Sequence, residues 1–302
     1  LGIDLWIKRD DLTGFAFGGN KGRKIEYLLG EAQSQGAQAV VTCGAAQSNF
    51  IRQLGAGCSI LGMKCAAAIM NLPYAAAHGR PAEAGNVVAK EGNIILDDLL
   101  GVELHRFEDD DWEVLYAHAD AIADDLETNG LKVYRIPIGG SSGIGAFAFV
   151  EAAKEVGKDF DYVITPCSSG STHAGLAYGF AGSNTRVIGI ACDPEPEIME
   201  DLVRLLGELD DVTGQTKNLT ESDLDFRLDW AGTAYGVPSS ESEAALTWLA
   251  QAEGIFLDPV YTAKAFAGVM ELAQSKQIEG RVLFWHTGGL PALFSGTRSA
   301  GT

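Results

Sequence analysis

The stretch YVITPCSSGSTHAGLAYGF, residues 162–180, contains the three features that decide the fold. Tyr162 to Thr165 form a short β-rich run, and a helix is predicted to begin near His173. Between them, residues 168–172 are glycine and hydroxyl residues. A strand, a glycine-rich loop and a helix in this order predict a unit of a parallel α/β sheet, with the loop at the carboxyl end of the strand.

The same alternation continues along almost the whole chain. The predicted strands are residues 5–7, 39–41, 65–70, 133–138, 162–165, 187–191 and 282–285. The predicted amphipathic helices are residues 25–33, 50–61, 86–100, 112–128, 239–252 and 263–274. The acidic run 108–111 is expected to begin a helix, and the weakly periodic segment 193–233 is expected to form surface helices or a mobile excursion. The sequence therefore predicts an α/β protein with largely parallel sheets.

Four glycine- and hydroxyl-rich loops each lie between a β-rich run and a helix, at residues 17–20, 44–49, 139–143 and 168–172. Ligands of open α/β sheets bind at such loops, where free N–H groups of helix N-termini face anions. Each loop alone is also compatible with an ordinary capped turn. The hydroxyls of Ser169, Ser171 and Thr172 suit a small monophosphate, and the chain lacks the P-loop pattern of nucleoside triphosphate sites. Residues 143–148 match G-x-G-x-x-A weakly and leave a nicotinamide-dependent oxidoreductase as an alternative.

Composition excludes several classes of partner. The 302 residues carry a formal net charge of −19, which disfavours nucleic acid and anionic membrane surfaces. Their number predicts one large or two modest domains. Five cysteines without a C-x-x-C pair argue against a disulfide framework or a structural metal and favour a reducing cytoplasm. The most apolar stretch, 54–77, is too interrupted to span a membrane, and a start at Leu1 without methionine leads us to expect missing N-terminal sequence.

Lys21 is the main candidate for a nucleophile. It follows Gly18-Gly19-Asn20 at the start of a predicted helix, beside Arg23 and Lys24. The positive end of the helix dipole and the two neighbouring cations are expected to disfavour a charged ammonium group there. An uncharged lysine amine can bind a carbonyl carbon covalently. The alternative is a surface lysine on a basic turn.

Ordered blocks along nearly the whole chain resemble a family of pyridoxal-phosphate enzymes. That family contains D-cysteine desulfhydrase, 1-aminocyclopropane-1-carboxylate (ACC) deaminase and L-cysteate sulfo-lyase. The resembling blocks are residues 7–11 with 18–26, 47–53, 136–141, 170–175, 235–238, 257–262 and 286–289. The resemblance implies the fold of the tryptophan-synthase β-subunit type (fold type II), with open twisted sheets and helices on both faces. It also implies a homodimer, a small amino-acid substrate, a larger cofactor-binding domain (1–32 plus 151–302) and a smaller domain (33–150) that closes over the substrate.

The resemblance assigns roles to individual residues. Lys21 would bind pyridoxal phosphate covalently and then move the proton at the substrate Cα, and Asn20 would contact the cofactor's phenolic oxygen. The phosphate would lie on Ser169, Gly170, Ser171 and Thr172. The substrate carboxylate would lie on Gln47, Ser48 and Asn49, with Phe50 beside it. Tyr235 and Tyr261 would line the pocket as hydroxyl donors, although each is also compatible with a half-buried packing residue.

Thr262 and Thr287 guide the choice within the family. The resemblance implies that Thr262 faces the pyridine nitrogen of the cofactor. At this position the deaminase has a carboxylate, which makes the cofactor ring a stronger electron sink. His286-Thr287 resembles the desulfhydrases. A neutral hydroxyl suits β-elimination, here of D-cysteine to sulfide, pyruvate and ammonia. Phe50 replaces the histidine usual after Gln-Ser-Asn, so L-cysteate sulfo-lyase, ACC deaminase and a non-catalytic amino-acid-binding relative stay open alternatives.

Overall fold

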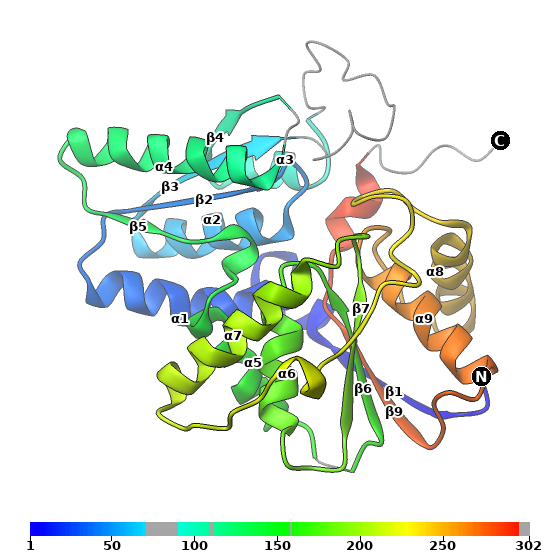
Figure 1. The fold of residues 1–302 in the computed structure, drawn as a ribbon. Helices are drawn as coiled ribbons and strands as arrows, with labels where there is room; N and C mark the ends of the chain where they lie inside the picture. The colour runs from blue at the N-terminus through cyan, green and yellow to red at the C-terminus, as the bar shows by residue number, and fades with distance from the viewer. Residues whose placement is uncertain (71–89, 109–110, 158, 296–302) are drawn as a thin grey trace.

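Two open parallel sheets form the framework of the protein (Figure 1). The computed structural model describes residues 1–70, 90–108, 111–157 and 159–295. The larger sheet has the order β1 (Asp4–Arg9), β9 (Arg281–His286), β6 (Tyr162–Cys167), β7 (Arg186–Ala191) and β8 (Asp225–Arg227). The smaller sheet has the order β4 (Glu103–Arg106), β3 (Lys64–Met70), β2 (Ala39–Ala45) and β5 (Val133–Arg135). The predicted α/β class and two-sheet architecture are confirmed.

Helices cover both faces of each sheet. They are α1 (Lys21–Ser34), α2 (Asn49–Leu61), α3 (Asn93–Leu99), α4 (Trp112–Thr128), α5 (Gly143–Ala153), α6 (Ser171–Phe180), α7 (Ile198–Thr213), α8 (Ser240–Glu253) and α9 (Thr262–Gln274). On the larger sheet, α8 and α9 pack on one face and α5 and α6 on the other, with α7 against α5 and α6. On the smaller sheet, α4 packs on one face and α2 on the other. Helix α1 contacts both α2 and α5 and so lies between the two layers (Figure 1).

Several elements differ from the sequence prediction. The strand expected over 133–138 ends at Arg135, because Pro137 leads into a 3-10 turn at Ile138–Gly140. The short strands β4 and β8 were not predicted, and residues 86–89 of the helix expected over 86–100 lie outside the described residues. Within 193–233, α7 buries a stripe of leucines at 202, 205, 206 and 209, so this part is a packed helix. The expected helix start after the acidic run is confirmed, since the Asp111 carboxylate accepts a hydrogen bond from Val114 N at 2.9 Å.

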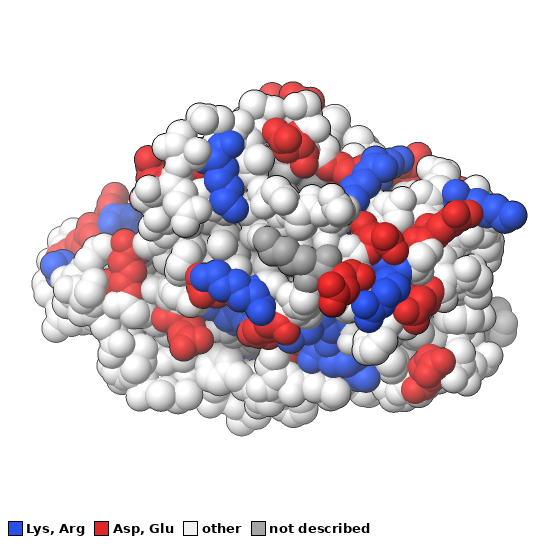
Figure 2. Space-filling model, turned by 90° about the horizontal axis from the view of Figure 1, so that it is seen from below, with Lys and Arg blue, Asp and Glu red and all other residues white. Residues whose placement is uncertain are grey.

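Acidic and basic side chains are mixed on the face shown in Figure 2. Lysine and arginine side chains there lie beside aspartate and glutamate, and the basic residues form no continuous patch on that face (Figure 2). Among the residues that the structure describes, no helix is long and apolar enough to cross a membrane.

A buried ion pair holds the first turn of α1 against the larger sheet. The Arg23 guanidinium donates two hydrogen bonds to the Asp10 carboxylate, at 2.9 and 2.8 Å. Asp10 is only 1% exposed and also accepts from the Trp285 indole at 2.8 Å. The outer side of Arg23 donates to Glu155 beyond the end of α5. These contacts join β1, α1, β9 and the end of α5 within one hydrogen-bonded network.

Replacing Arg23 with alanine is expected to lower the free energy of unfolding by about 3 kcal/mol, because the Asp10 carboxylate would stay buried without its cation. Urea unfolding of Arg23→Ala and wild type measures the difference. Arg135→Ala is the matched control, since Arg135 is exposed and pairs with surface carboxylates only; its loss is expected to stay within about 1 kcal/mol. Equal losses in the two variants would contradict the importance of the buried pair.

Candidate active site

Two adjoining cavities lie at the carboxyl ends of β6 and β9. Their walls contain residues from the layers of both sheets. The inner cavity has a volume of about 40 Å³ and the outer one about 400 Å³. Residues lining both are Lys21, Asn49, Ser168, Ser169 and Tyr261. Because Lys21 lies on the boundary, a ligand bound to its side chain would contact both spaces.

The loop before Lys21 has a conformation that requires glycine. Gly18 has φ +70° and Gly19 φ +119°, and a Cβ on Gly19 would lie 2.8 Å from the Gln53 side chain. Gly18 O accepts hydrogen bonds from Arg52, at 3.0 Å, and from Gln53, both on α2. Asn20 N donates to Thr287 O at 2.9 Å. Segments of both sheets therefore fix the direction in which α1, and with it Lys21, begins.

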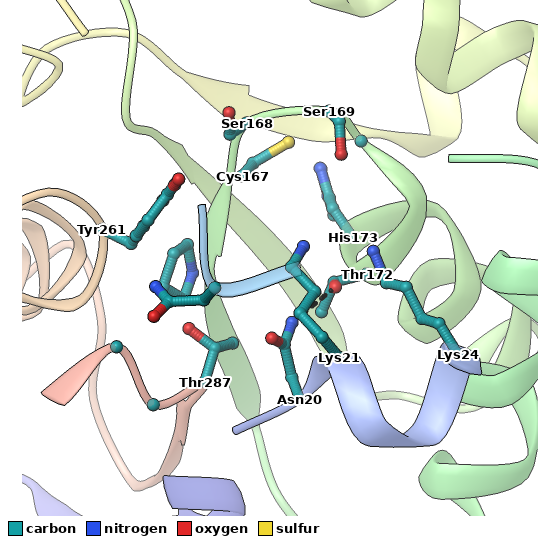
Figure 3. A pocket seen from close by; sticks show the side chains of 15 residues that line it. Asn20, Lys21, Lys24, Cys167, Ser168, Ser169, Thr172, His173, Tyr261 and Thr287 are labelled. Carbon is teal, nitrogen blue, oxygen red and sulfur yellow. Dashed lines mark hydrogen bonds between the residues drawn. The ribbon is translucent and has the colours of Figure 1, made fainter. Parts of the chain in front are cut away.

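Lys21 and Lys24 point from the first turn of α1 towards the loop carrying Ser168 and Ser169 (Figure 3). Burial lowers the pKa of Lys21, while Lys24 acts in the opposite direction. The direction of the shift agrees with the prediction, but burial is its main cause. Of the two neighbouring cations expected to contribute, Arg23 turns away to Asp10 and Lys24 acts in the opposite direction. Burial and the charge of Lys21 lower the pKa of Lys24 well below its usual value. Both amines are therefore easier to deprotonate than exposed lysines.

The loop 168–172 forms a cradle of the kind that holds a phosphate. Gly170, with φ +86°, precedes α6 and gives the loop its turn at the helix N-terminus. Lys24 Nζ donates to Ser171 Oγ at 2.6 Å and to Gly139 O at 3.2 Å. A Cβ at Gly139 would lie 2.5 Å from Ser169 Oγ and 3.7 Å from Lys21 Nζ, so a glycine keeps the space between them open. This arrangement of amides, hydroxyls and amines fits pyridoxal phosphate.

The residues predicted to contact the cofactor ring lie at different depths. Asn20 lines the inner cavity and its side-chain amide donates to Thr172 Oγ1 at 3.0 Å. Thr287 also lines that cavity. Thr262 lines neither cavity, because its hydroxyl is buried and donates to Asp258 Oδ1 at 2.6 Å. Of the two threonines, Thr287 is therefore the one placed to meet a ring bound beside Lys21.

The N-terminus of α2 contributes to the walls of both cavities. Ser48 caps the helix, its Oγ accepting from Ile51 N at 3.3 Å, and it lines the outer cavity. Asn49 Oδ1 accepts from Arg52 at 2.8 Å and Asn93 at 3.1 Å, which fixes the orientation of the amide at the junction of the two cavities.

Gln47 and Phe50, the other two residues predicted to bind the substrate, have different surroundings from Ser48 and Asn49. The Gln47 side chain turns to residues 91–93, where its Oε1 accepts from Asn93 N at 2.8 Å, and it lines neither cavity. Phe50 lines the outer cavity but is 1% exposed, with its ring against Gly140. Phe50 thus contributes an apolar ring edge to the outer cavity.

Tyr235 and Tyr261 meet across the outer cavity, and their hydroxyls form a hydrogen bond. Burial raises the pKa of both phenols, so they remain protonated and can donate. The position of Tyr235 depends on Lys264 of α9, which is fully buried. Its ammonium donates to Ala231 O, Cys192 O and Ala234 O at 2.6, 2.8 and 3.0 Å. Lys264 thereby holds the loop that carries Tyr235 against the end of β7.

Sequence reasoning missed three charged residues of this region: Lys24, Asp193 and Lys264. Lys24 lies three residues after Lys21, and this spacing places the two on one helix face. Asp193 and Lys264 carry no comparable signal, because a buried charge is recognised only from the three-dimensional contacts around it. Among the predicted site residues, the structure places Ser171, Thr262 and the Gln47 side chain outside the cavity walls.

Comparison with known proteins agrees with this geometry. The family described as "Pyridoxal-phosphate dependent enzyme" matches residues 1–288. The chain is 36% identical to a D-cysteine desulfhydrase of Salmonella choleraesuis (strain SC-B67), over 98% of this chain and 89% of that protein. A solved structure of an ACC deaminase homologue is 34% identical, with a TM-score of 0.87, and covers 97% of this chain and 86% of that one.

A second solved structure, of O-ureido-L-serine synthase, has a TM-score of 0.66 at 16% identity and shares the fold alone. It covers 99% of this chain and 89% of its own. The family match, the relatives and the lysine-containing phosphate cradle lead to the same result. The chain belongs to the pyridoxal-phosphate dependent enzymes, in the family of D-cysteine desulfhydrase and ACC deaminase.

Proposed function

We propose that this enzyme is a carbon–sulfur lyase that eliminates sulfide from D-cysteine or a close β-substituted amino acid. The products would be pyruvate, ammonia and sulfide, with one water consumed. The observation that carries the proposal is the lack of carboxylates around the inner cavity: none of the described residues that line it is an aspartate or glutamate. The relative at 36% identity, a D-cysteine desulfhydrase, supports the same reaction.

A lining without carboxylates favours elimination over ring opening. Pyridoxal phosphate, when bound, supplies an electron sink for the pair left at the substrate Cα. A carboxylate beside the ring nitrogen would keep that nitrogen protonated and the sink strong, as the ring opening of ACC deaminase requires. Thr287, which lines the inner cavity, would offer a neutral hydroxyl in place of that carboxylate. A weaker sink is sufficient where a good leaving group departs from Cβ.

In the proposed reaction, Lys21 removes the Cα proton, a task that its lowered pKa favours because the amine must be uncharged to accept it. Ser48 and Asn49 hold the substrate carboxylate at the N-terminus of α2. The hydrogen-bonded pair of Tyr235 and Tyr261 donates a proton to the departing sulfur. Lys24 with Ser169, Gly170 and Thr172 would hold the cofactor phosphate, and Asn20 would contact its phenolic oxygen.

The same proposal includes the wider features that the family implies. Residues 33–150 would form the domain that closes over the substrate, with 1–32 and 151–302 forming the cofactor-binding domain. The enzyme would act as a homodimer in the cytoplasm. L-cysteate and ACC are the substrates to compare with D-cysteine.

Lys21→Ala is expected to abolish both the visible absorption band of the lysine-bound cofactor and the release of pyruvate and sulfide from D-cysteine. The amine is needed for covalent binding and for proton transfer. Absorption spectra with both products assayed in the same cuvette measure these effects, and Lys154→Ala, which removes an exposed lysine, is the control.

Two outcomes contradict parts of this proposal. Product release by Lys21→Ala at the wild-type rate would exclude Lys21 as the base. A Lys21-dependent band without product from D-cysteine would reject that substrate, and L-cysteate or ACC would then be tested in its place.

Tyr261→Phe is expected to lower kcat for D-cysteine about 100-fold, because the thiolate leaves more slowly without a proton donor. With β-chloroalanine the loss is expected to be much smaller, since chloride leaves without a proton. Steady-state kinetics on both substrates separate the effects, and Tyr27→Phe, away from both cavities, serves as the control. An equal loss on both substrates would argue against proton donation by the tyrosine pair.

A further inference from the structure

The outer cavity continues beyond the two tyrosines to a wall of charged side chains. Four carboxylates and one guanidinium line this part: Asp193, Glu195, Asp201, Glu208 and Arg204. Cysteine itself ends in a thiol and has no group that would reach this wall. The charged end of the cavity therefore has no role in the reaction proposed above.

The outer part of the wall is paired internally. Arg204 donates to Asp201 at 2.7 Å and also to Glu208. Glu208 Oε2 accepts a further hydrogen bond from Gly143 N at 2.6 Å. The guanidinium is thus engaged by two carboxylates and is not free to bind an anionic ligand without losing these contacts.

Asp193 is the exception within this wall. It follows the end of β7, is only 3% exposed, and its Oδ1 has no hydrogen-bond partner among the described residues. Lys264 acts on it electrostatically, but the ammonium donates to three backbone carbonyls and forms no described ion pair with Asp193 within 4 Å. A buried carboxylate oxygen without a donor is unfavourable, and its place in a substrate cavity indicates that a ligand supplies the donor.

The surroundings of Asp193 also select the sign of the ligand's charge. Burial and the neighbouring Glu195 raise the pKa of Asp193 to about 7. A cationic group placed beside Asp193 would relieve both unfavourable effects, because it would supply hydrogen bonds and an opposite charge. A carboxylate or sulfonate there would instead be repelled by both acids.

We infer that Asp193 forms a subsite for the far end of the β-substituent and selects amino acids whose substituent ends in an ammonium group. The inference rests on the proposed elimination reaction and names the substrate class of the same site. For S-(2-aminoethyl)cysteine, Lys21 would remove the Cα proton and the Cβ–S bond would break. The sulfur would keep the bonding electrons and gain a proton, giving 2-aminoethanethiol, and one water would complete the conversion of the remainder to pyruvate and ammonia.

The test compares three substrates that differ only in the end of the substituent. S-(2-aminoethyl)cysteine, S-(2-hydroxyethyl)cysteine and S-(carboxymethyl)cysteine are assayed for pyruvate in the enantiomer that the enzyme accepts. Wild type is expected to prefer the amine to the alcohol in kcat/KM by about tenfold or more, with the carboxylate last. Asp193→Asn is expected to remove most of this preference while leaving the alcohol substrate nearly unaffected, which also shows that the variant folds.

Two further variants make the test specific. Glu195→Gln is expected to reduce the preference in the same direction but less, since Glu195 acts on the ligand mainly through its charge. Glu200→Gln removes one negative charge from the exposed side of α7, outside the cavity, and is expected to leave the preference unchanged. A preference retained in Asp193→Asn, or a wild type that prefers the carboxylate, would overturn the inference.

A binding measurement keeps the inference distinct from the proposed reaction. Lysine and norleucine carry no leaving group at Cβ, and their affinities for the holoenzyme can be measured by titration calorimetry. Wild type is expected to bind lysine about tenfold more tightly, and Asp193→Asn about equally. If no compound yields pyruvate but this difference holds, the elimination proposal fails and the subsite stands. Equal binding of lysine and norleucine by wild type would reject the subsite whatever the reaction.

Discussion

Two lysines one helical turn apart, facing a cavity that no described aspartate or glutamate lines, are the constraint on which the site depends. Lys24 is 1% exposed, and burial lowers the pKa of both amines. Two buried amines without a carboxylate are unfavourable in isolation, so the site is suited to an anion and to covalent capture of one amine. The glycine-rich loop before α6 supplies the remaining donors. Pyridoxal phosphate meets both needs, through its phosphate and its aldehyde.

The two sheets are joined through the same lysine-bearing turn. Arg52 and Gln53 of α2 bind Gly18 O, and Arg52 also fixes Asn49. Arg52 thus holds both the turn that precedes Lys21 and Asn49, which is proposed to bind the substrate carboxylate. On the other side, the buried Asp10–Arg23 pair ties α1 to the larger sheet. A shift of either layer would therefore change the distance between the reacting groups.

Much of the fold could be predicted because its signals are local. Seven strands and most amphipathic helices follow from residue type and period, and the loop from Ser168 to Thr172 follows from its place between strand and helix. Helix α5 was expected only as the helix after residues 139–143, and its range was not predicted because it is apolar on most sides and has no amphipathic stripe. Helix α7 was not predicted as a packed helix, because the many acidic residues between its leucines make the apolar stripe hard to recognise in the sequence.

The site was predictable where a motif places a residue at the end of a strand or the start of a helix, as for Lys21, Ser48 and Thr287. The position of a site residue was not predictable where its side chain can form a hydrogen bond with either of two neighbours. Gln47 turns to Asn93, and Thr262 turns to Asp258, and neither choice can be read from spacing. Asp193 and Lys264 become notable only through burial, which depends on the whole fold.

The most direct test of this account is the affinity of the apoenzyme for pyridoxal phosphate compared with pyridoxal, in wild type and in Lys24→Met. The account predicts that wild type strongly prefers the phosphorylated compound and that Lys24→Met loses about tenfold or more of this preference while binding pyridoxal as before. An unchanged preference in Lys24→Met, or equal losses for both compounds, would contradict the claim that the buried lysine pair forms the phosphate site.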